Sequence, residues 1–297
     1  MKENDFNICI TIDVDFTAYE FRNELCNEFE EVFPMLWALF SDRPNWRATW
    51  FVRLDHHMKT IYGCPDYIFT KYKREISYLR ELGHEIGWHP HCYSNSGNKW
   101  SQNVDTSKIL KELNELIPLV KSHHLNVARM GWGFQTNEIM RHLSERGFTV
   151  DSSAIPRPRY QWEDSIKDWT STPLYPYYPS IHDYRIPGDN HLQILEVPMS
   201  VAYIMSPDDE GEVLRCFNLS YKPEVLKVPL ENWINNHNHL VTVAHPYELM
   251  TWNTKHPLYA YNINAFESNV LQIEDQVAAI GKHIKFITTS DFIRYPV

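Results

Sequence analysis

Strand-like and helix-like segments alternate along most of this 297-residue chain. The expected strands are short apolar runs with many β-branched residues, at 7–15, 48–52, 84–89, 127–129, 148–151, 192–197, 240–245 and 284–288. The expected helices have apolar residues at helical spacing, at 19–40 (with a kink at Pro34), 65–82, 106–120, 137–146, 224–236 and 265–280. This alternation predicts right-handed βαβ crossovers, and therefore an α/β fold built on a parallel sheet or barrel.

The alternation stops at about residues 156–190, in a segment rich in proline and aromatic residues. Long irregular segments inside compact domains are usually functional, so we expect aromatic side chains here to bind substrate. The candidates are Trp162, Trp169 and Tyr177, together with Trp132 from an earlier loop. No shift in composition marks a linker, so residues 1–297 are expected to form a single domain with this segment as an irregular insertion.

Composition narrows the classes of partner. A formal net charge of −10 argues against a nucleic-acid backbone. No stretch is long and apolar enough to span a bilayer, and the first five residues are too polar to begin a signal peptide. The five cysteines are scattered without a CxxC pair, which disfavours a disulfide framework or a thiolate-bound zinc. We therefore expect a cytoplasmic protein without membrane or nucleic-acid partners.

Polar side chains stand where several of the expected strands end. They are Asp13 and Asp15 after the first strand, His89 and His91 after the third, and Arg129 and His245 after two later ones. The carboxyl ends of strands form the site in parallel α/β folds, so these residues are expected to meet. Taken singly, each has an ordinary alternative: an exposed acidic turn for the aspartates, an ion-pair partner for Arg129 and a packed strand end for His245.

His89 and His91 have the spacing of metal ligands. Side chains at i and i+2 of an extended chain point to the same side, so an HxH sequence directs both imidazoles toward one ion. Two imidazoles and one carboxylate that leave coordination positions open suit zinc or another first-row divalent ion acting on water. We therefore expect a divalent metal cofactor, with Zn2+ favoured.

The ordered motifs of the chain resemble those of the polysaccharide deacetylase (NodB-homology) superfamily. They are Thr11-Ile12-Asp13-Val14-Asp15, Gly83-His84-Glu85-Ile86-Gly87-Trp88-His89, Arg129-Met130-Gly131-Trp132-Gly133 and the strand-end His245. The resemblance runs from Ile8 to about Pro246, and each motif lies at an expected strand end. It implies a distorted (β/α)7 barrel and metal-dependent hydrolysis of an N- or O-acyl group, commonly N-acetyl on an amino sugar.

The resemblance also implies a role for each matching residue. Asp13 corresponds to the general base, Asp15 and His89 to metal ligands, Arg129 to the residue that orients the base, and His245 to the general acid. The family usually places its second histidine ligand four residues after the first, where this chain has Tyr93, so His91 is expected to substitute at a shorter spacing. Asp151-Ser152-Ser153 matches the fourth motif only loosely, and Asp151 is left without a role.

The first motif departs from the adjacent aspartates of most family members. An Asp-Val-Asp sequence belongs with a variant branch that includes cytosolic enzymes acting on other C–N bonds. The leading hypothesis is therefore a hydrolase that deacylates a carbohydrate or a sugar-linked small molecule, and the alternative is hydrolysis of a non-sugar amide or cyclic imide. The imperfect second and fourth motifs motivate a further hypothesis, a carbohydrate-binding protein on a hydrolase fold that has lost its activity. A glycosyltransferase ranks last, because it would leave the HxH pair without a role.

Overall fold

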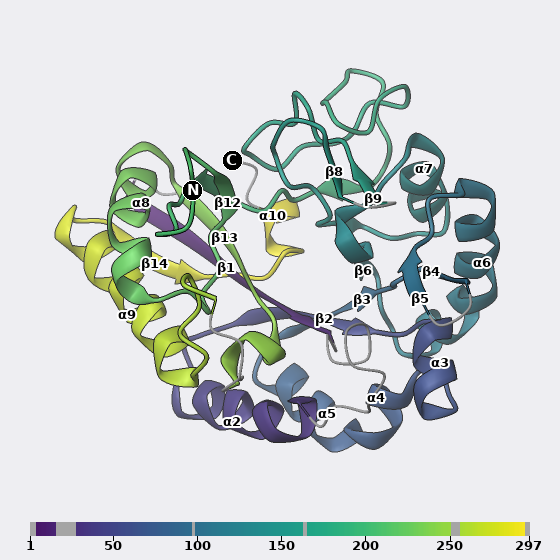
Figure 1. The fold of residues 1–297 in the computed structure, drawn as a ribbon, viewed down its shortest axis with the longest axis horizontal. Helices are drawn as coiled ribbons and strands as arrows, with labels where there is room; N and C mark the ends of the chain where they lie inside the picture. Colours follow the sequence, from purple (N-terminus) through teal and green to yellow (C-terminus); the bar gives the residue numbers. More distant parts are fainter. Residues whose placement is uncertain (1–3, 16–27, 97–98, 163–164, 251–255, 295–297) are drawn as a thin grey trace.

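A parallel sheet forms the centre of the protein in the computed structural model, which describes residues 4–15, 28–96, 99–162, 165–250 and 256–294. The strands of this sheet are β1 (Asp5–Val14), β2 (Ala48–Arg53), β3 (Glu85–His89), β6 (Val127–Ala128), β7 (Val150–Asp151), β10 (Leu195–Glu196), β13 (His239–Ala244) and β14 (His283–Phe286). Their order is β10-β7-β6-β3-β2-β1-β13, and β14 pairs with β1 (Figure 1). The expected parallel α/β sheet is confirmed.

Strand β1 is the most heavily paired strand of the sheet. Strand β13 pairs with residues 7–12 of β1, while β14 pairs with residues 5–8 and β2 with residues 10–14. All ten residues of β1 are buried. Strand β1 is therefore an interior strand of the sheet, between β2 and β13, and its last residues lie inside the sheet rather than at an edge.

The two faces of β1 belong to different cores. Ile10 and Ile12 pack in the large core between sheet and helices. Cys9 packs in a smaller core whose members come from several strands and fill the inside of the barrel. Side chains alternate along a strand, so the inner row continues from Cys9 through Thr11 to Asp13. Asp13 therefore lies on the inner face of the barrel, at the carboxyl end of β1.

Irregular backbone closes the barrel between β10 and β13. Ser200 N donates to Val241 O at 3.0 Å, and Val243 N donates to Phe217 O at 3.0 Å. Leu219 N in turn donates to Val243 O at 2.9 Å. These bonds replace a regular ladder between the last two strands, and the result is a distorted (β/α)7 barrel, as expected from the sequence.

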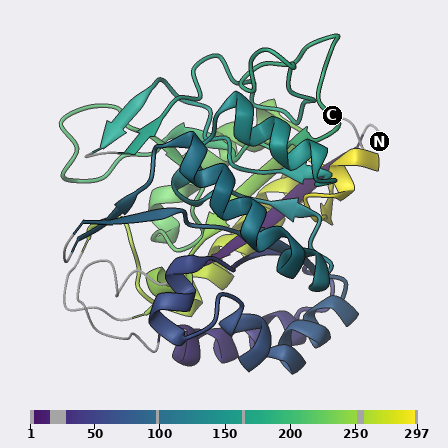
Figure 2. The same cartoon turned by 90° about the vertical axis from the view of Figure 1, so that its right-hand side faces the viewer.

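The helices surround the sheet on its outer side (Figures 1 and 2). They are α2 (Glu28–Asp42), α3 (His56–Tyr62), α4 (Tyr67–Lys71), α5 (Lys73–Glu81), α6 (Thr106–Ser122), α7 (Asn137–Glu145), α8 (Pro223–Asn236), α9 (Ile263–Ala279) and α10 (Asp291–Arg294). Asp105 and Thr136 cap α6 and α7, because their side chains accept hydrogen bonds from backbone N–H groups in the first turns of these helices. None of the helices among the described residues is long and apolar enough to cross a membrane.

Some elements differ from the expectation. The helix expected at 65–82 is divided into α4 and α5, which meet at Tyr72. The strand expected at 192–197 is reduced to the two residues of β10. The first part of the helix expected at 19–40, residues 19–27, lies outside the described residues. These differences leave the order of strands and helices unchanged.

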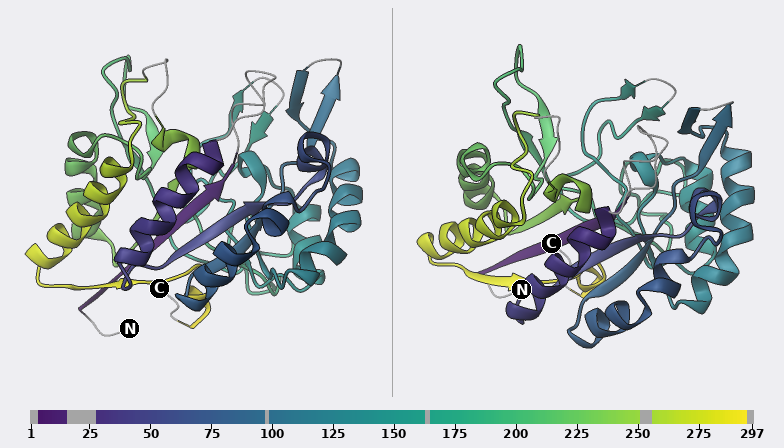
Figure 3. Two further views of the ribbon diagram at one scale, coloured as in Figure 1. Left: turned by 90° about the horizontal axis from the view of Figure 1, so that it is seen from below. Right: turned by 60° about the horizontal axis from the view of Figure 1, so that its bottom comes forward.

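Three antiparallel hairpins were not expected. Their strands are β4 (Tyr93–Ser96) with β5 (Lys99–Gln102), β8 (Tyr160–Trp162) with β9 (Ser165–Lys167), and β11 (Val201–Tyr203) with β12 (Leu214–Cys216). All three project from the same side of the barrel (Figure 3). Each follows a strand of the central sheet, so the hairpins surround the end at which those strands stop.

Candidate active site

The polar residues at the strand ends meet in one cavity of about 430 Å3. Its lining includes Asp13, Asp15, His89, His91, Arg129 and His245. They come from distant parts of the chain: Asp13 from β1, His89 from β3, and Arg129 and His245 from the residues directly after β6 and β13. A cavity of this volume at the carboxyl ends of parallel strands has the size and position of a small-molecule site.

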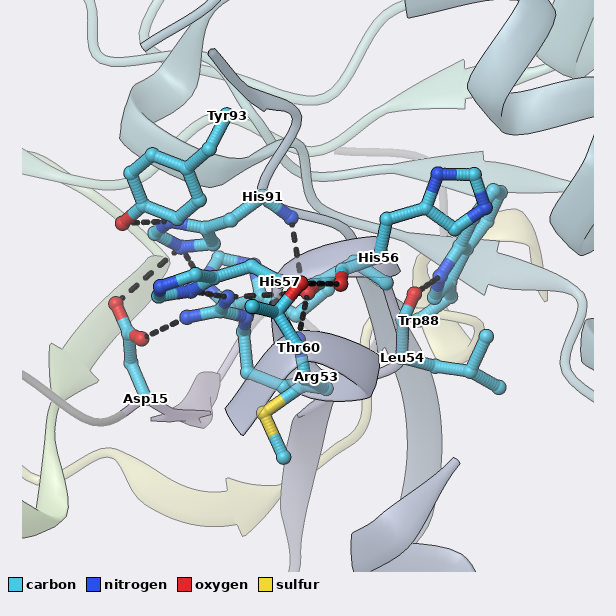
Figure 4. Close-up of polar contacts among 12 residues, drawn as sticks. Asp15, Arg53, Leu54, His56, His57, Thr60, Trp88, His91 and Tyr93 are labelled. Carbon is cyan, nitrogen blue, oxygen red and sulfur yellow. Dashed lines mark hydrogen bonds and ion pairs between the residues drawn. The ribbon is translucent and has the colours of Figure 1, made fainter. Parts of the chain in front are cut away.

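Asp15, His89 and His91 form a compact cluster of potential metal ligands. His91 Nε2 lies 3.0 Å from His89 Nε2 and 3.2 Å from Asp15 Oδ2. One donor atom from each residue lies within 4.8 Å of the other two. Figure 4 shows His91 and Asp15 facing each other across this point. The tertiary structure therefore places the His91 ring beside that of His89, although His91 follows His89 by two residues rather than by the four that are usual in the family.

The outer nitrogen of each imidazole has a partner of its own. His89 Nδ1 donates to the backbone O of Arg129 at 2.8 Å, which leaves its Nε2 with a free lone pair. His91 Nδ1 lies 2.9 Å from Tyr93 Oη (Figure 4). Such contacts are typical of metal-binding histidines, because they fix the tautomer and the direction of the ring. Two nitrogens and a carboxylate oxygen held in this way fit a divalent ion such as zinc.

Gly131 makes room for the His91 ring. A Cβ atom at position 131 would lie 2.4 Å from His91 Cδ2 and 2.8 Å from its Nε2. The ring cannot move aside freely, because Tyr93 and Asp15 contact its two nitrogens. Glycine at this position is therefore part of the cluster's construction, although it has no donor atom.

Arg53 joins Asp15 to a second carboxylate. Arg53 Nη1 donates to Asp15 Oδ1 and Arg53 Nε donates to Asp55 Oδ2, both at 2.5 Å. Asp55 also accepts from the backbone N of Met58, at the start of α3, and from the backbone N of His91 at 3.1 Å. Arg53 and Asp55 are fully buried. The pair holds one oxygen of Asp15 and leaves the other facing the histidines.

Asp13 is held in a similar way by Arg129. Arg129 Nη1 donates to Asp13 Oδ1 and to Thr11 Oγ1, each at 2.7 Å. Arg129 Nε and Nη2 donate to the backbone O and the Oγ of Ser152, and its guanidinium lies over the Phe51 ring at 4.3 Å. The other oxygen of Asp13 lies 3.8 Å from His245 Nε2. Arg129 thus fixes the carboxylate while one oxygen stays open to the cavity.

His245 faces Asp13 on one side and Glu248 on the other. Its Nδ1 lies 3.1 Å from Glu248 Oε1, and its backbone N donates to Glu248 Oε2 at 3.0 Å. Asn218 Nδ2 donates to both oxygens of the same carboxylate. Burial opposes the charged form of the imidazole, but Glu248 and, more weakly, Asp13 outweigh it and raise the pKa of His245 to about 9. His245 is therefore protonated at neutral pH.

The aromatic residues expected to bind substrate are placed differently. Trp132 lines the cavity. Trp169 and Tyr177 are only 1% and 3% exposed; Trp169 Nε1 donates to Gly133 O and Tyr177 Oη donates to Tyr184 O. A sugar ring cannot stack on buried rings, so the expectation is wrong for these two residues. Trp162 ends β8, and its side chain lies outside the described residues.

The structure adds functional candidates that the sequence patterns did not indicate. Tyr221, Tyr247 and Tyr259 supply aromatic surface in the cavity in place of the buried rings. Glu248 contacts His245, and the only signal for it is that it follows that histidine by three residues. Arg53 ends β2 and directly follows the strand expected at 48–52, and that position was its signal.

Asp151 lies in the structural framework rather than in the cavity lining. It is fully buried, and it accepts from Ser153 Oγ at 2.8 Å and from Gln135 Nε2 at 3.2 Å. Burial raises the pKa of Asp151 and of its neighbour Glu196. These two carboxyl groups, at the ends of β7 and β10, accept hydrogen bonds from Ser153 Oγ and from the backbone N of Ala154.

Comparisons with known proteins show what the chain is similar to. It matches no protein-family model and no curated protein. It is similar in structure to a provisionally assigned polysaccharide deacetylase from Mycobacterium smegmatis, with a TM-score of 0.54 and 16% identity over 99% of this chain and 91% of that chain. It is also similar to a 4-alpha-glucanotransferase from Thermococcus litoralis, with a TM-score of 0.56 and 12% identity over 99% of this chain but 41% of that chain. At these identities the likeness establishes the fold, which is that of a polysaccharide-deacetylase-like barrel.

Proposed function

We propose that this protein is a metal-dependent hydrolase that removes an acyl group from a carbohydrate or a sugar-linked small molecule, and that N-acetyl is the favoured acyl group. The observation that carries the proposal is the arrangement around one cavity. A compact Asp15-His89-His91 cluster lies beside an aspartate held by Arg129 and a histidine held by Glu248. Fold likeness to a provisionally assigned polysaccharide deacetylase and to a glucanotransferase agrees with a carbohydrate substrate.

Asp15, His89 and His91 would hold the metal ion. A divalent ion with open coordination positions polarises an acyl oxygen and makes water more acidic. The fixed tautomer of His89 and the contact of Arg53 with Asp15 Oδ1 keep the remaining donor atoms pointing to one place. The chain itself thus supplies three ligands and leaves room for water and substrate.

Asp13 and His245 would move the protons. Asp13 Oδ2 accepts the proton of the attacking water as the new C–O bond forms at the acyl carbon, and Arg129 keeps that carboxylate oriented. His245 Nε2 donates its proton to the nitrogen as the C–N bond breaks, so the products are a carboxylic acid and a free amine. Glu248 keeps His245 charged and therefore able to act as this acid at neutral pH.

The direct test is metal removal combined with a substrate panel. The full chain is treated with chelator, assayed by metal analysis and by acid release, and then reloaded with Zn2+. We expect loss of turnover without metal and recovery with it. Retained turnover in protein that contains no metal would refute the proposal. In the panel, N-acetyl sugars are compared with O-acetyl sugars, ureides and cyclic imides, and turnover of the last two alone would establish the non-sugar alternative. Sugar binding without turnover of any acyl compound would instead establish an inactive binding protein.

A further inference from the structure

Two positively charged side chains, Arg157 and Lys167, line the candidate active site, and neither has a carboxylate partner among the described residues. Arg157 lies in the irregular segment after β7, and Lys167 ends β9. Both line the same cavity as Asp15 and His91. Each is instead held by an aromatic ring: Arg157 Cζ lies 4.2 Å from the ring centroid of Tyr160, and Lys167 Nζ lies 5.6 Å from that of Trp132. Contact with a ring orients a cation but does not neutralise it.

The other arginines of the cavity lining are neutralised by the protein itself. Arg129 lies 2.7 Å from Asp13, and Arg215 lies 2.7 Å from Asp209. Among the described residues, no carboxylate lies within ion-pair distance of Arg157 or Lys167. The chain carries a net charge of −10, whereas these two side chains bring to the cavity a positive charge that no described carboxylate neutralises.

The surroundings of Lys167 disfavour its charged form. Burial first, and then the charge of Arg157, lower the pKa of Lys167 to about 8. Lys167 is half-buried, and partial removal from water disfavours its charge, whereas a bound anion would offset that cost. Arginine and lysine side chains are also the usual groups that bind planar or tetrahedral oxyanions.

We propose that the substrate carries an oxyanion, a carboxylate or a phosphate, and that Arg157 and Lys167 bind it within the cavity that holds the Asp15-His89-His91 cluster. This inference rests on the proposed function and specifies its substrate class: an acylated acidic sugar rather than a neutral one. Trp132 links the two parts of the site, because its ring lies 6.2 Å from that of His91 as well as near Lys167.

The first experiment measures binding to the metal-free full chain by titration calorimetry, with glucose, glucose 6-phosphate and glucuronic acid as probes. Removing the metal prevents phosphate or carboxylate from binding to the ion instead. We expect at least one acidic sugar to bind about 10- to 100-fold more tightly than glucose, the effect of one or two charge-assisted hydrogen bonds. The stronger of the two identifies the oxyanion. Equal binding of all three sugars, or binding of none, would overturn the proposal.

The second experiment uses Arg157→Met and Lys167→Met, which keep the aliphatic stem and remove the charge. Arg159→Met is the matched control, since it removes the same charge from an exposed residue of the same segment. We expect the preference for the acidic sugar to fall about tenfold in each variant and to persist in the control. A preference that survives in the double variant would overturn the assignment to these residues. Because these measurements need neither metal nor turnover, their failure is distinguishable from failure of the proposed hydrolysis.

Discussion

Asp13 and Asp15 are separated only by Val14, and a buried arginine binds one oxygen of each. Their surroundings nevertheless differ in charge. Arg129 forms an ion pair with Asp13 alone, so that pair is neutral. Arg53 is shared by Asp15 and Asp55, so those three groups carry a net negative charge. The second oxygen of Asp13 lies 3.8 Å from Nε2 of the cationic His245, whereas the second oxygen of Asp15 lies 3.2 Å from His91 Nε2. Under the proposed function, this difference in surrounding charge would suit Asp13 to accept a proton and Asp15 to bind a cation.

The sharpest way to break this comparison is to neutralise each aspartate in turn. Asp15→Asn should lose both metal and turnover, because it removes a ligand and the negative charge around it. Asp13→Asn should keep the metal stoichiometry and lose about 10²- to 10⁴-fold in kcat/KM, the usual contribution of a general base. Metal analysis and steady-state kinetics on the two variants check this. If both lost metal equally, the two aspartates would not have separate roles.

Gly131→Ala should weaken metal binding about 10- to 100-fold, as loss of a group that positions a ligand does. The added methyl group would overlap the His91 ring, 2.4 Å away at Cδ2. Gly211→Ala is the control, because a Cβ atom at that position meets no atom within 4 Å. Competition with a zinc chelator measures the affinity. Unchanged affinity in the Gly131 variant would show that His91 is not a ligand.

Glu248→Gln tests the Asp13 side of the comparison through pH. The raised pKa of His245, about 9, means that the acid is protonated at neutral pH and that activity is lost as pH rises through that value. Removing the charge of Glu248 lowers this pKa, so the alkaline limb of kcat should move to lower pH by about one unit or more. Metal content should stay unchanged. Glu145→Gln, at an exposed position, serves as the control, and an unmoved limb would contradict the role of Glu248.

The smallest expected effect is that of Tyr93→Phe. It removes the hydroxyl that contacts His91 Nδ1 at 2.9 Å and leaves the ring in place. Metal affinity should fall by about tenfold, at the low end for a group that orients a ligand. The same chelator competition measures it. A loss as large as that of Asp15→Asn would mean that Tyr93 itself binds the metal.

Much of the barrel followed from the chain's local pattern. Strands β1, β2 and β13 are long, apolar and buried on both faces, so their periodicity could be read without knowledge of their neighbours. The segment between Pro156 and Asn190 could not be read in this way. Its strands β8 and β9 are three residues long, its other pairings are isolated bridges, and its backbone is held by contacts such as that of Tyr177 with Glu196.

The candidate site divides along the same line. The polar residues that the sequence identified lie within two residues of the ends of regular strands, where a polar side chain is easily recognised after an apolar run. Glu248 and Tyr93 follow those ends by a few residues, and Arg157 and Lys167 lie in the irregular segment, so nothing in their local sequence distinguishes them from ordinary surface residues. Trp169 and Tyr177 show the opposite error, because an aromatic residue in a loop can equally be buried.

The pattern of the sequence was therefore enough to predict a parallel α/β fold, the end of the sheet at which polar residues gather and the spacing of Asp13, Asp15, His89 and His91, while the barrel was implied by the family resemblance. Local periodicity and strand ends carry that information. The tertiary structure was needed to find three further partners: Arg53, with a second carboxylate, for Asp15, Tyr93 for His91, and Glu248 for His245. These pairings depend on packing between segments far apart in the chain, and charge and direction of a side chain are set by that packing rather than by its neighbours in sequence.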